Sequence, residues 1–208
     1  MASSLPQGEV IKLRGVRLSF PHLKTPKKFD EDNEKEEAKF QASFLLDPGN
    51  DDHKKMIREC DREIKRLKSE SGIDDDEFKP LQCFGKGDKK KNKKTKEPYD
   101  GYAGMYFVSS SNIKRPVLKD SKGNNLTPEE AEQMMYGGCY VHANVNFWVQ
   151  DNKFGQAINC SLRGVVFCRD GEAFGAGAVS DDEFDDVLEG GEIDLDDDDL
   201  DLDGDLGL

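Results

Sequence analysis

The segment YVHANVNFWV, residues 140–149, alternates small apolar side chains with polar and aromatic ones along its whole length. The apolar set is Val141, Ala143, Val145, Phe147 and Val149, and the other set is Tyr140, His142, Asn144, Asn146 and Trp148. Such alternation places successive side chains on opposite faces of a β-strand. The segment therefore predicts a half-buried strand whose outward face carries aromatic rings and amides.

Two segments nearer the N-terminus show the same period. In VIKLRGVRLSF, residues 10–20, the apolar positions before Gly15 are Ile11 and Leu13, and those after it are Val16, Leu18 and Phe20. A phase slip at a glycine is typical of a β-bulge. The segment AKFQASFLL, residues 38–46, keeps one phase, with inward Ala38, Phe40, Ala42, Phe44 and Leu46 and outward Lys39, Gln41 and Ser43. Both segments are predicted to be strands.

Two later segments add further strands. In FGQAINCSLRGVVF, residues 154–167, the inward set is Ile158, Cys160, Leu162 and Val166, and the outward set is Asn159, Ser161 and Arg163. The segment GYAGMYFVSSSNI, residues 101–113, is also strand-like, although its parity is ambiguous. About five strands with few helices favour a mainly β chain that forms a small barrel over a parallel α/β sheet.

Two helices are predicted between the strands. Residues 50–68 repeat Met56, Ile57, Cys60, Ile64 and Leu67 at helical spacing. Residues 126–138 begin with Thr127 as N-cap, Pro128 in the first turn and Glu130 completing a capping box, and Gly137 and Gly138 are the expected stop. Residues 69–98 are rich in Lys, Asp and Gly and are expected to be largely loop.

Charge is distributed very unevenly along the chain. The net charge is -13, but residues 181–208 hold 15 of the 43 acidic residues and no Lys or Arg. Residues 1–180 therefore carry 30 basic and 28 acidic residues, and seven of the lysines lie between Lys86 and Lys96. A lysine cluster of this kind binds polyanions, and the competing interpretation is that both charged segments are solvated and serve solubility.

The outward residues indicate a surface for single-stranded nucleic acid. If the strands pair side by side, one sheet face collects Lys12, Arg14, Arg17, Lys39, Gln41, Tyr140, His142, Asn146, Trp148 and Arg163. The further candidate contacts are Tyr102, Lys89, Lys90, Lys91, Lys93 and Lys94. Aromatic rings stack on bases of any sequence, and lysines meet phosphates. The alternative is that a helix or loop covers Trp148 and Tyr140, which then extend the core.

Catalytic and metal-binding functions find little support in the sequence. His22, His53 and His142 lie far apart without ligand spacing, and no P-loop, GxSxG, HExxH or zinc-ribbon pattern occurs. No enzyme activity, metal or cofactor is therefore expected. Five cysteines without CxxC spacing are predicted to be reduced thiols, most of them in the core. Without a signal-like or membrane-spanning segment, the expected location is the cytoplasm, with no membrane partner.

The sequence resembles the single-stranded DNA-binding proteins of tailed bacteriophages. The residues that carry the resemblance are GVRLSFPHL near the start, the lysine-rich loop, and YGGCYVHANVNFWVQDNKFGQAINCSLRGVVFCRDGEAFGAG, residues 136–177. The resemblance implies an OB-fold five-stranded barrel with one or two helices in residues 1–179 and a disordered acidic tail in residues 180–208. It also implies single-stranded DNA as the ligand and a role in phage DNA replication or recombination in the cytoplasm of the infected bacterial host.

The same resemblance implies that the tail contacts phage replication proteins, such as a polymerase, helicase or nuclease. Better-known tails of this type end in an aromatic residue, whereas this chain ends with Leu206, Gly207 and Leu208. We expect the tail to compete with DNA for the basic surface when DNA is absent. Two rival functions remain open from the residues alone, an acidic-tailed chaperone or scaffold for basic proteins and a DNA-processing enzyme. Self-association is also left open.

Overall fold

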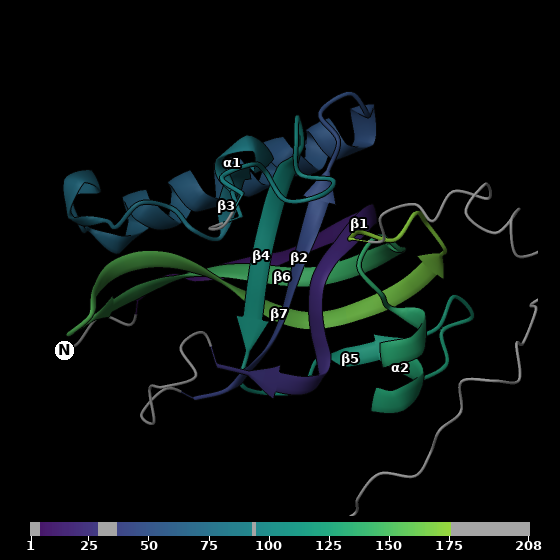
Figure 1. Ribbon diagram of the computed structural model, residues 1–208. Coiled ribbons are helices and arrows are strands. Elements are labelled where there is room, and N and C mark those ends of the chain that lie inside the picture. The colour runs from purple at the N-terminus through teal and green to yellow at the C-terminus, as the bar shows by residue number, and fades with distance from the viewer. Residues whose placement is uncertain (1–4, 29–36, 93–94, 176–208) are drawn as a thin grey trace, which may run out of the picture. The chain divides into compact units, whose positions relative to one another are not determined.

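The computed structural model describes residues 5–28, 37–92 and 95–175 and contains a closed five-stranded barrel (Figure 1). Its strands are β1 (Gln7–Lys27), β2 (Lys39–Leu46), β4 (Tyr106–Asn112), β6 (Tyr140–Asn152) and β7 (Gly155–Arg169). Neighbours pair antiparallel in the order β4-β2-β1-β6-β7, and a parallel contact between Ser111 of β4 and Ser161 of β7 closes the barrel. The mainly β, OB-fold prediction is confirmed.

Smaller elements complete the structure. Two three-residue strands lie outside the barrel strands, β3 (Phe84–Lys86) beside β4 and β5 (Val117–Lys119) beside β7. The region 69–98, predicted to be largely loop, therefore includes β3, as well as the end of a helix and two short 3-10 turns. The predicted boundary at residue 180 and the acidic tail lie outside the described residues. Among the described helices, none is long and apolar enough to cross a membrane.

The predicted bulge in β1 is present at Gly15, where φ is 63°. Leu13 pairs with Ala143 and Val16 with Val141, so three steps in β1 match two in β6. This extra residue keeps Ile11, Leu13, Val16 and Leu18 buried. The prediction that Phe20 is also buried is wrong, because a second irregularity lies between Ser19 and His22, where Phe20 has a φ of 47° and is 47% exposed.

The inward face of β6 is as predicted, and so is that of β2 from Phe40 to Leu46, but Ala38 precedes β2 and is only partly buried. The prediction for β7 contains one error. All five apolar positions of β6 are buried, and so are Ile158, Cys160 and Leu162 of β7. Val166 is only partly buried, however, and Val165 takes the inward position at 0% exposure. The pairing changes from Val145 with Leu162 to Asn144 with Gly164, so Arg163 is an additional residue that reverses the parity of the strand.

Both predicted helices form. The helix α1 (Asp51–Ser71) begins at Asn50, whose side chain accepts hydrogen bonds from two backbone N–H groups, and ends at Gly72 in the left-handed conformation. Its buried face is Met56, Cys60, Ile64 and Leu67, and Figure 1 shows the helix lying across one end of the barrel. The helix α2 (Pro128–Met134) has the predicted capping box of Thr127 and Glu130, and it ends before the predicted glycine stop.

The five cysteines carry free thiols, as predicted for a reduced core. Cys60, Cys83, Cys139 and Cys160 are buried, and Cys168 is partly buried. Burial is the main cause that raises the pKa of Cys60, Cys83 and Cys139 to about 12. These thiols therefore remain protonated at neutral pH and act as small apolar groups.

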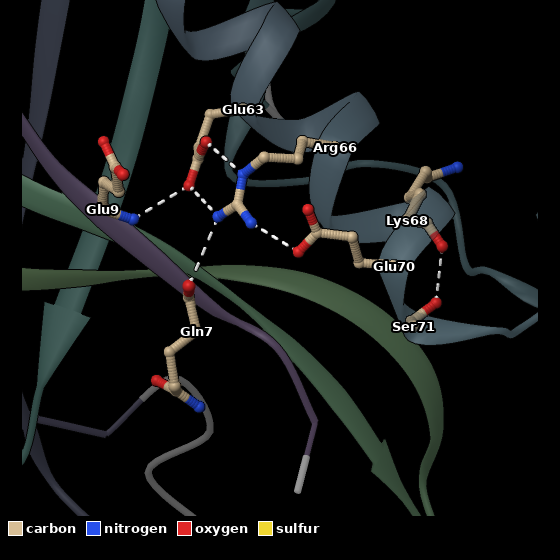
Figure 2. A network of polar contacts seen from close by, with 7 residues as sticks. All are labelled: Gln7, Glu9, Glu63, Arg66, Lys68, Glu70 and Ser71. Atoms are coloured by element: carbon tan, nitrogen blue, oxygen red, sulfur yellow. Dashed lines mark hydrogen bonds and ion pairs between the residues drawn. The ribbon is translucent and has the colours of Figure 1, made fainter. Parts of the chain in front are cut away.

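A polar network joins α1 to the start of β1 (Figure 2). Arg66 donates to both carboxylate oxygens of Glu63, at 2.9 and 2.7 Å, and to the carbonyl oxygen of Gln7 at 3.3 Å. The backbone N–H of Glu9 donates to the same carboxylate at 2.8 Å. The pKa of Glu63 is lowered from its ordinary value of 4.5, mainly by the hydrogen bonds from the Arg66 guanidinium. The network ties the second half of α1 to the first residues of β1.

We predict that Glu63→Gln destabilises the fold by about 1 to 2 kcal/mol at pH 7, because the bond between Arg66 and a charged acceptor is lost. The pKa of Glu63 is lowered in the folded state, so its contribution is present above pH 4.5 and disappears as the pH falls through the lowered value. Urea unfolding of both proteins across this range measures the difference. The control Asp61→Asn breaks an exposed pair with Lys65 and should cost below about 0.5 kcal/mol. A Glu63→Gln deficit that persists unchanged in acid contradicts the assignment.

Candidate functional site

A groove of about 880 Å³ lies on the outward side of β2, β4, β7 and β6, and we call it the sheet groove. Its floor consists of small polar side chains, which are Ser43 of β2, Ser109 and Ser111 of β4 and Ser161 of β7. Ser43 and Ser109 share a hydrogen bond of 2.8 Å between their hydroxyl oxygens. Because serines are short, a flat ring can approach the backbone of the sheet closely here.

Aromatic rings line two parts of the sheet groove. Phe20 meets Tyr99 edge to face, with ring centroids 4.9 Å apart, and Tyr102 lies behind both at about 6 Å. Tyr102 is only 1% exposed, and burial raises the pKa of its hydroxyl. Trp148 belongs to β6, and its side chain is partly exposed. Phe20, Tyr99 and Trp148 therefore present the accessible rings.

The sheet groove is rich in cations. Among the residues that the structure describes, its lining includes four lysines, Lys27, Lys28, Lys39 and Lys90, and one acidic residue, Glu37. The ammonium of Lys90 lies 4.8 Å from the centre of the Phe107 ring, and burial lowers its pKa. Burial, followed by the charge of Lys27, lowers the pKa of His22, so this ring is neutral at pH 7. The groove offers rings, hydroxyls and positive charge together.

A second hollow of about 640 Å³ lies between the first half of α1 and the outward side of β1 and β6, and we call it the helix groove. It contains three of the predicted site residues, Lys12, Arg14 and His142. The remaining lining comes largely from α1 and includes His53, Lys55 and Glu59.

Arg17 and Tyr140 form neither groove. The Arg17 guanidinium lies 4.3 Å from the centre of the Phe174 ring and 5.8 Å from that of Tyr140. Arg17 also donates to the carbonyl oxygens of Gly138 and Glu172. Arg169 covers Tyr140 at 3.5 Å. Arg17 thus holds Glu172 and Phe174 against the barrel, and the Tyr140 ring is covered by two guanidinium groups.

The prediction that one sheet face collects all these residues is therefore wrong, because the residues are divided between two grooves and some line neither. Lys39, Gln41, Lys90, Tyr102 and Trp148 line the sheet groove, and Lys12, Arg14 and His142 line the helix groove. Arg163 and Asn146 lie between them on β7 and β6, joined by a contact of 3.5 Å. Lys89 and Lys91 line neither groove, and Lys93 and Lys94 lie outside the described residues. Curvature of the closed barrel and the bulges at Gly15 and Arg163 separate the strands' outward faces.

Sequence reasoning missed several groove residues. The alternation predicts an inward Phe20, because nothing local marks the second irregularity of β1. Tyr99 follows the lysine loop and reaches the groove only through tertiary packing on Phe20. The serines of VSSSNI were visible as a short polar run, but the ambiguous parity hid which of them face outward. In the described part of the chain, no group of three or more His, Cys, Asp or Glu side chains is placed to hold a metal.

Comparison with known proteins identifies the family. The family model described as the Enterobacter phage Enc34 ssDNA-binding protein matches residues 9–199. The chain belongs to this family. The resemblance to phage single-stranded DNA-binding proteins is thereby confirmed. A relative from Acyrthosiphon pisum secondary endosymbiont phage 1, described as putative protein p50, is 37% identical over 187 residues, which is 85% of this chain and 93% of the relative.

Solved structures of the Enc34 protein agree with this membership. The single-stranded DNA-binding protein from bacteriophage Enc34 has 26% identity and a TM-score of 0.63, covering 82% of this chain and 87% of that one. The structure of that protein in complex with ssDNA has 25% identity and a TM-score of 0.64, covering 84% of this chain and all 100% of the other. The Enc34 family thus shares the barrel described here.

Proposed function

We propose that the chain binds single-stranded DNA in the sheet groove, largely independently of sequence. The observation that carries this proposal is that accessible rings and four lysines line one groove whose serine floor lies largely on the outward face of β2 and β4. The corresponding strands of an OB-fold are the surface on which oligonucleotides bind. Membership of the Enc34 family, one of whose proteins has been solved with ssDNA, supports the same ligand.

On this proposal the groove chemistry favours single strands over duplex and does not favour any one base sequence. Trp148, Phe20 and Tyr99 offer flat faces, and only unpaired bases expose their own faces for stacking. Serine hydroxyls donate and accept, so they hydrogen-bond to any base edge without selecting one. Lys39 and Lys90 supply charge for the phosphates. No step in this scheme needs a reactive group, so we propose a non-catalytic role.

We further propose a role in phage DNA replication or recombination in the cytoplasm of the infected host. Residues 181–208 hold 15 acidic residues and no basic ones, so this segment carries the same sign of charge as DNA. On this proposal the tail competes with DNA for the basic surface when DNA is absent. DNA binding then releases the tail for a replication protein such as a polymerase, helicase or nuclease.

Trp148 gives the direct test, because it is the sole tryptophan of the chain. Titration with oligo(dT) should quench its emission, and saturation without any change would contradict binding in the sheet groove. Trp148→Ala and Phe20→Ala should each weaken binding by roughly 1 to 3 kcal/mol, the usual contribution of one stacked base. These affinities are measured by anisotropy of labelled DNA. The control Val117→Ala removes an exposed apolar side chain outside both grooves and should leave affinity unchanged.

Two double variants of lysines test whether DNA affinity depends on where a lysine lies or only on the net charge of the protein. Lys39 and Lys90 line the sheet groove, whereas Lys89 and Lys91 are exposed outside it. Lys39→Gln/Lys90→Gln should reduce the magnitude of the log-log salt slope by about 1.4, taking roughly 0.7 for each phosphate contact on single strands. Lys89→Gln/Lys91→Gln makes the same change in net charge and should alter the slope much less. Equal effects of the two double variants would mean that the lysines act only through overall charge.

Removal of residues 180–208 tests the tail. The deletion removes 15 acidic residues, so the remaining body should bind single-stranded DNA more tightly, mostly at low salt, where screening is weak. The same deletion should abolish binding to the cognate replication protein. Isothermal titration at about 20 mM and about 300 mM salt compares the two proteins across the range in which screening changes. Equal affinity at the lower salt rejects the competition model and leaves recruitment as the tail's role.

A further inference from the structure

The helix groove contains cations that the rest of the structure does not use. Lys12 and Arg14 project from β1, are exposed, and form no ion pair with any side chain that the structure describes. Lys55 of α1 pairs with Asp52 at 2.9 Å, so that these two charges cancel. Glu59 is the other acidic residue of the lining. The groove is therefore weakly positive, and its uncompensated charge comes from β1.

Two histidines in the helix groove are fixed as hydrogen-bond donors. The Nδ1 atom of His142 accepts from the backbone N–H of Gly15 at 3.0 Å, and Nδ1 of His53 accepts from that of Asp47 at 2.9 Å. When Nδ1 of a neutral imidazole accepts, its proton sits on Nε2. Each ring therefore presents a donor on its other side. Two donors and two cations around one hollow favour an anionic ligand with several oxygen atoms.

The outward face of β6 connects the helix groove to the sheet groove. Where β6 pairs with β1, the extra residues at both register shifts belong to β1. The alternation along β6 is therefore unbroken, and one face carries His142, Asn144, Asn146 and Trp148. His142 lines the helix groove and Trp148 lines the sheet groove. They are six residues apart, or about 20 Å along a strand. Between them, Arg163 donates to Asn146, so a further cation lies on this route.

We propose that a single DNA strand longer than the sheet groove continues past Trp148 along the outward face of β6 and places its phosphates in the helix groove. The inference rests on the proposed function, since it concerns the same strand of DNA. Lys12 and Arg14 neutralise the phosphates there, and the Nε2 atoms of His53 and His142 donate to their oxygens. The rings that stack on bases lie in the sheet groove, so the helix groove adds affinity through the backbone of the DNA alone.

The test compares two lengths of oligo(dT) on the full chain carrying Lys12→Gln/Arg14→Gln. A strand of about 5 nucleotides is near the lower limit for one OB-fold, and one of about 30 exceeds the upper limit. The variant should bind the long strand roughly 10- to 30-fold more weakly at about 0.1 M salt, with a salt slope smaller by about 1.4. It should bind the short strand as the unaltered protein does. Emission of Trp148 reports on both.

The control variant Lys65→Gln/Lys122→Gln makes the same change in net charge at exposed positions that line neither groove. It should leave both affinities unchanged. Equal losses on the long strand in the two double variants, or no loss in Lys12→Gln/Arg14→Gln, overturn the inference while leaving the sheet groove intact. Loss on the short strand in Lys12→Gln/Arg14→Gln also overturns it. If neither strand quenches Trp148 in the unaltered protein, the proposed function itself fails.

Discussion

The parallel contact between β4 and β7 is the constraint on which the site depends. One bridge joins Ser111 to Ser161, and the amide of Asn112 donates to the carbonyl oxygen of Leu162 at 3.0 Å beside it. This contact brings β7 next to β4, so that the floor of the sheet groove crosses from β2 to β6 without a gap. Serines at the junction keep that floor low. The contact that closes the barrel therefore also forms the floor of the groove.

Additional residues in the strands decide which side chains face the groove. The irregularity after Ser19 turns Phe20 out of the core, where its φ is positive and its ring packs against Tyr99. The extra residue Arg163 sends Val165 inward. The bulge at Gly15 lets His142 accept a backbone hydrogen bond from that glycine. In each case a local departure from strand geometry serves the outward surface, while the core stays continuous.

The barrel could be predicted from the sequence because buried faces leave a periodic signal. The alternation in residues 140–149, the slip at Gly15 and the capping box at Thr127 all describe local structure, and all are present. The site was less predictable, because its geometry depends on barrel closure and on loop packing. Trp148 and Lys39 reach the sheet groove as expected, but nothing local separates them from Lys12 and Arg14. The period of apolar residues predicts which side chains share one face of a strand. It does not predict how the sheet curves.

Tyr140 shows why residue type alone does not identify a stacking surface. Its ring has the same parity as Trp148 on the same strand, and both are partly buried. Guanidinium groups of Arg17 and Arg169 already occupy the neighbourhood of the Tyr140 ring, and Arg17 is held in turn by two backbone carbonyl oxygens. A base would have to displace these cations, whose attraction to an aromatic face is itself favourable. Trp148 has no such cover among the described residues, so of these two rings it is the one available to a ligand.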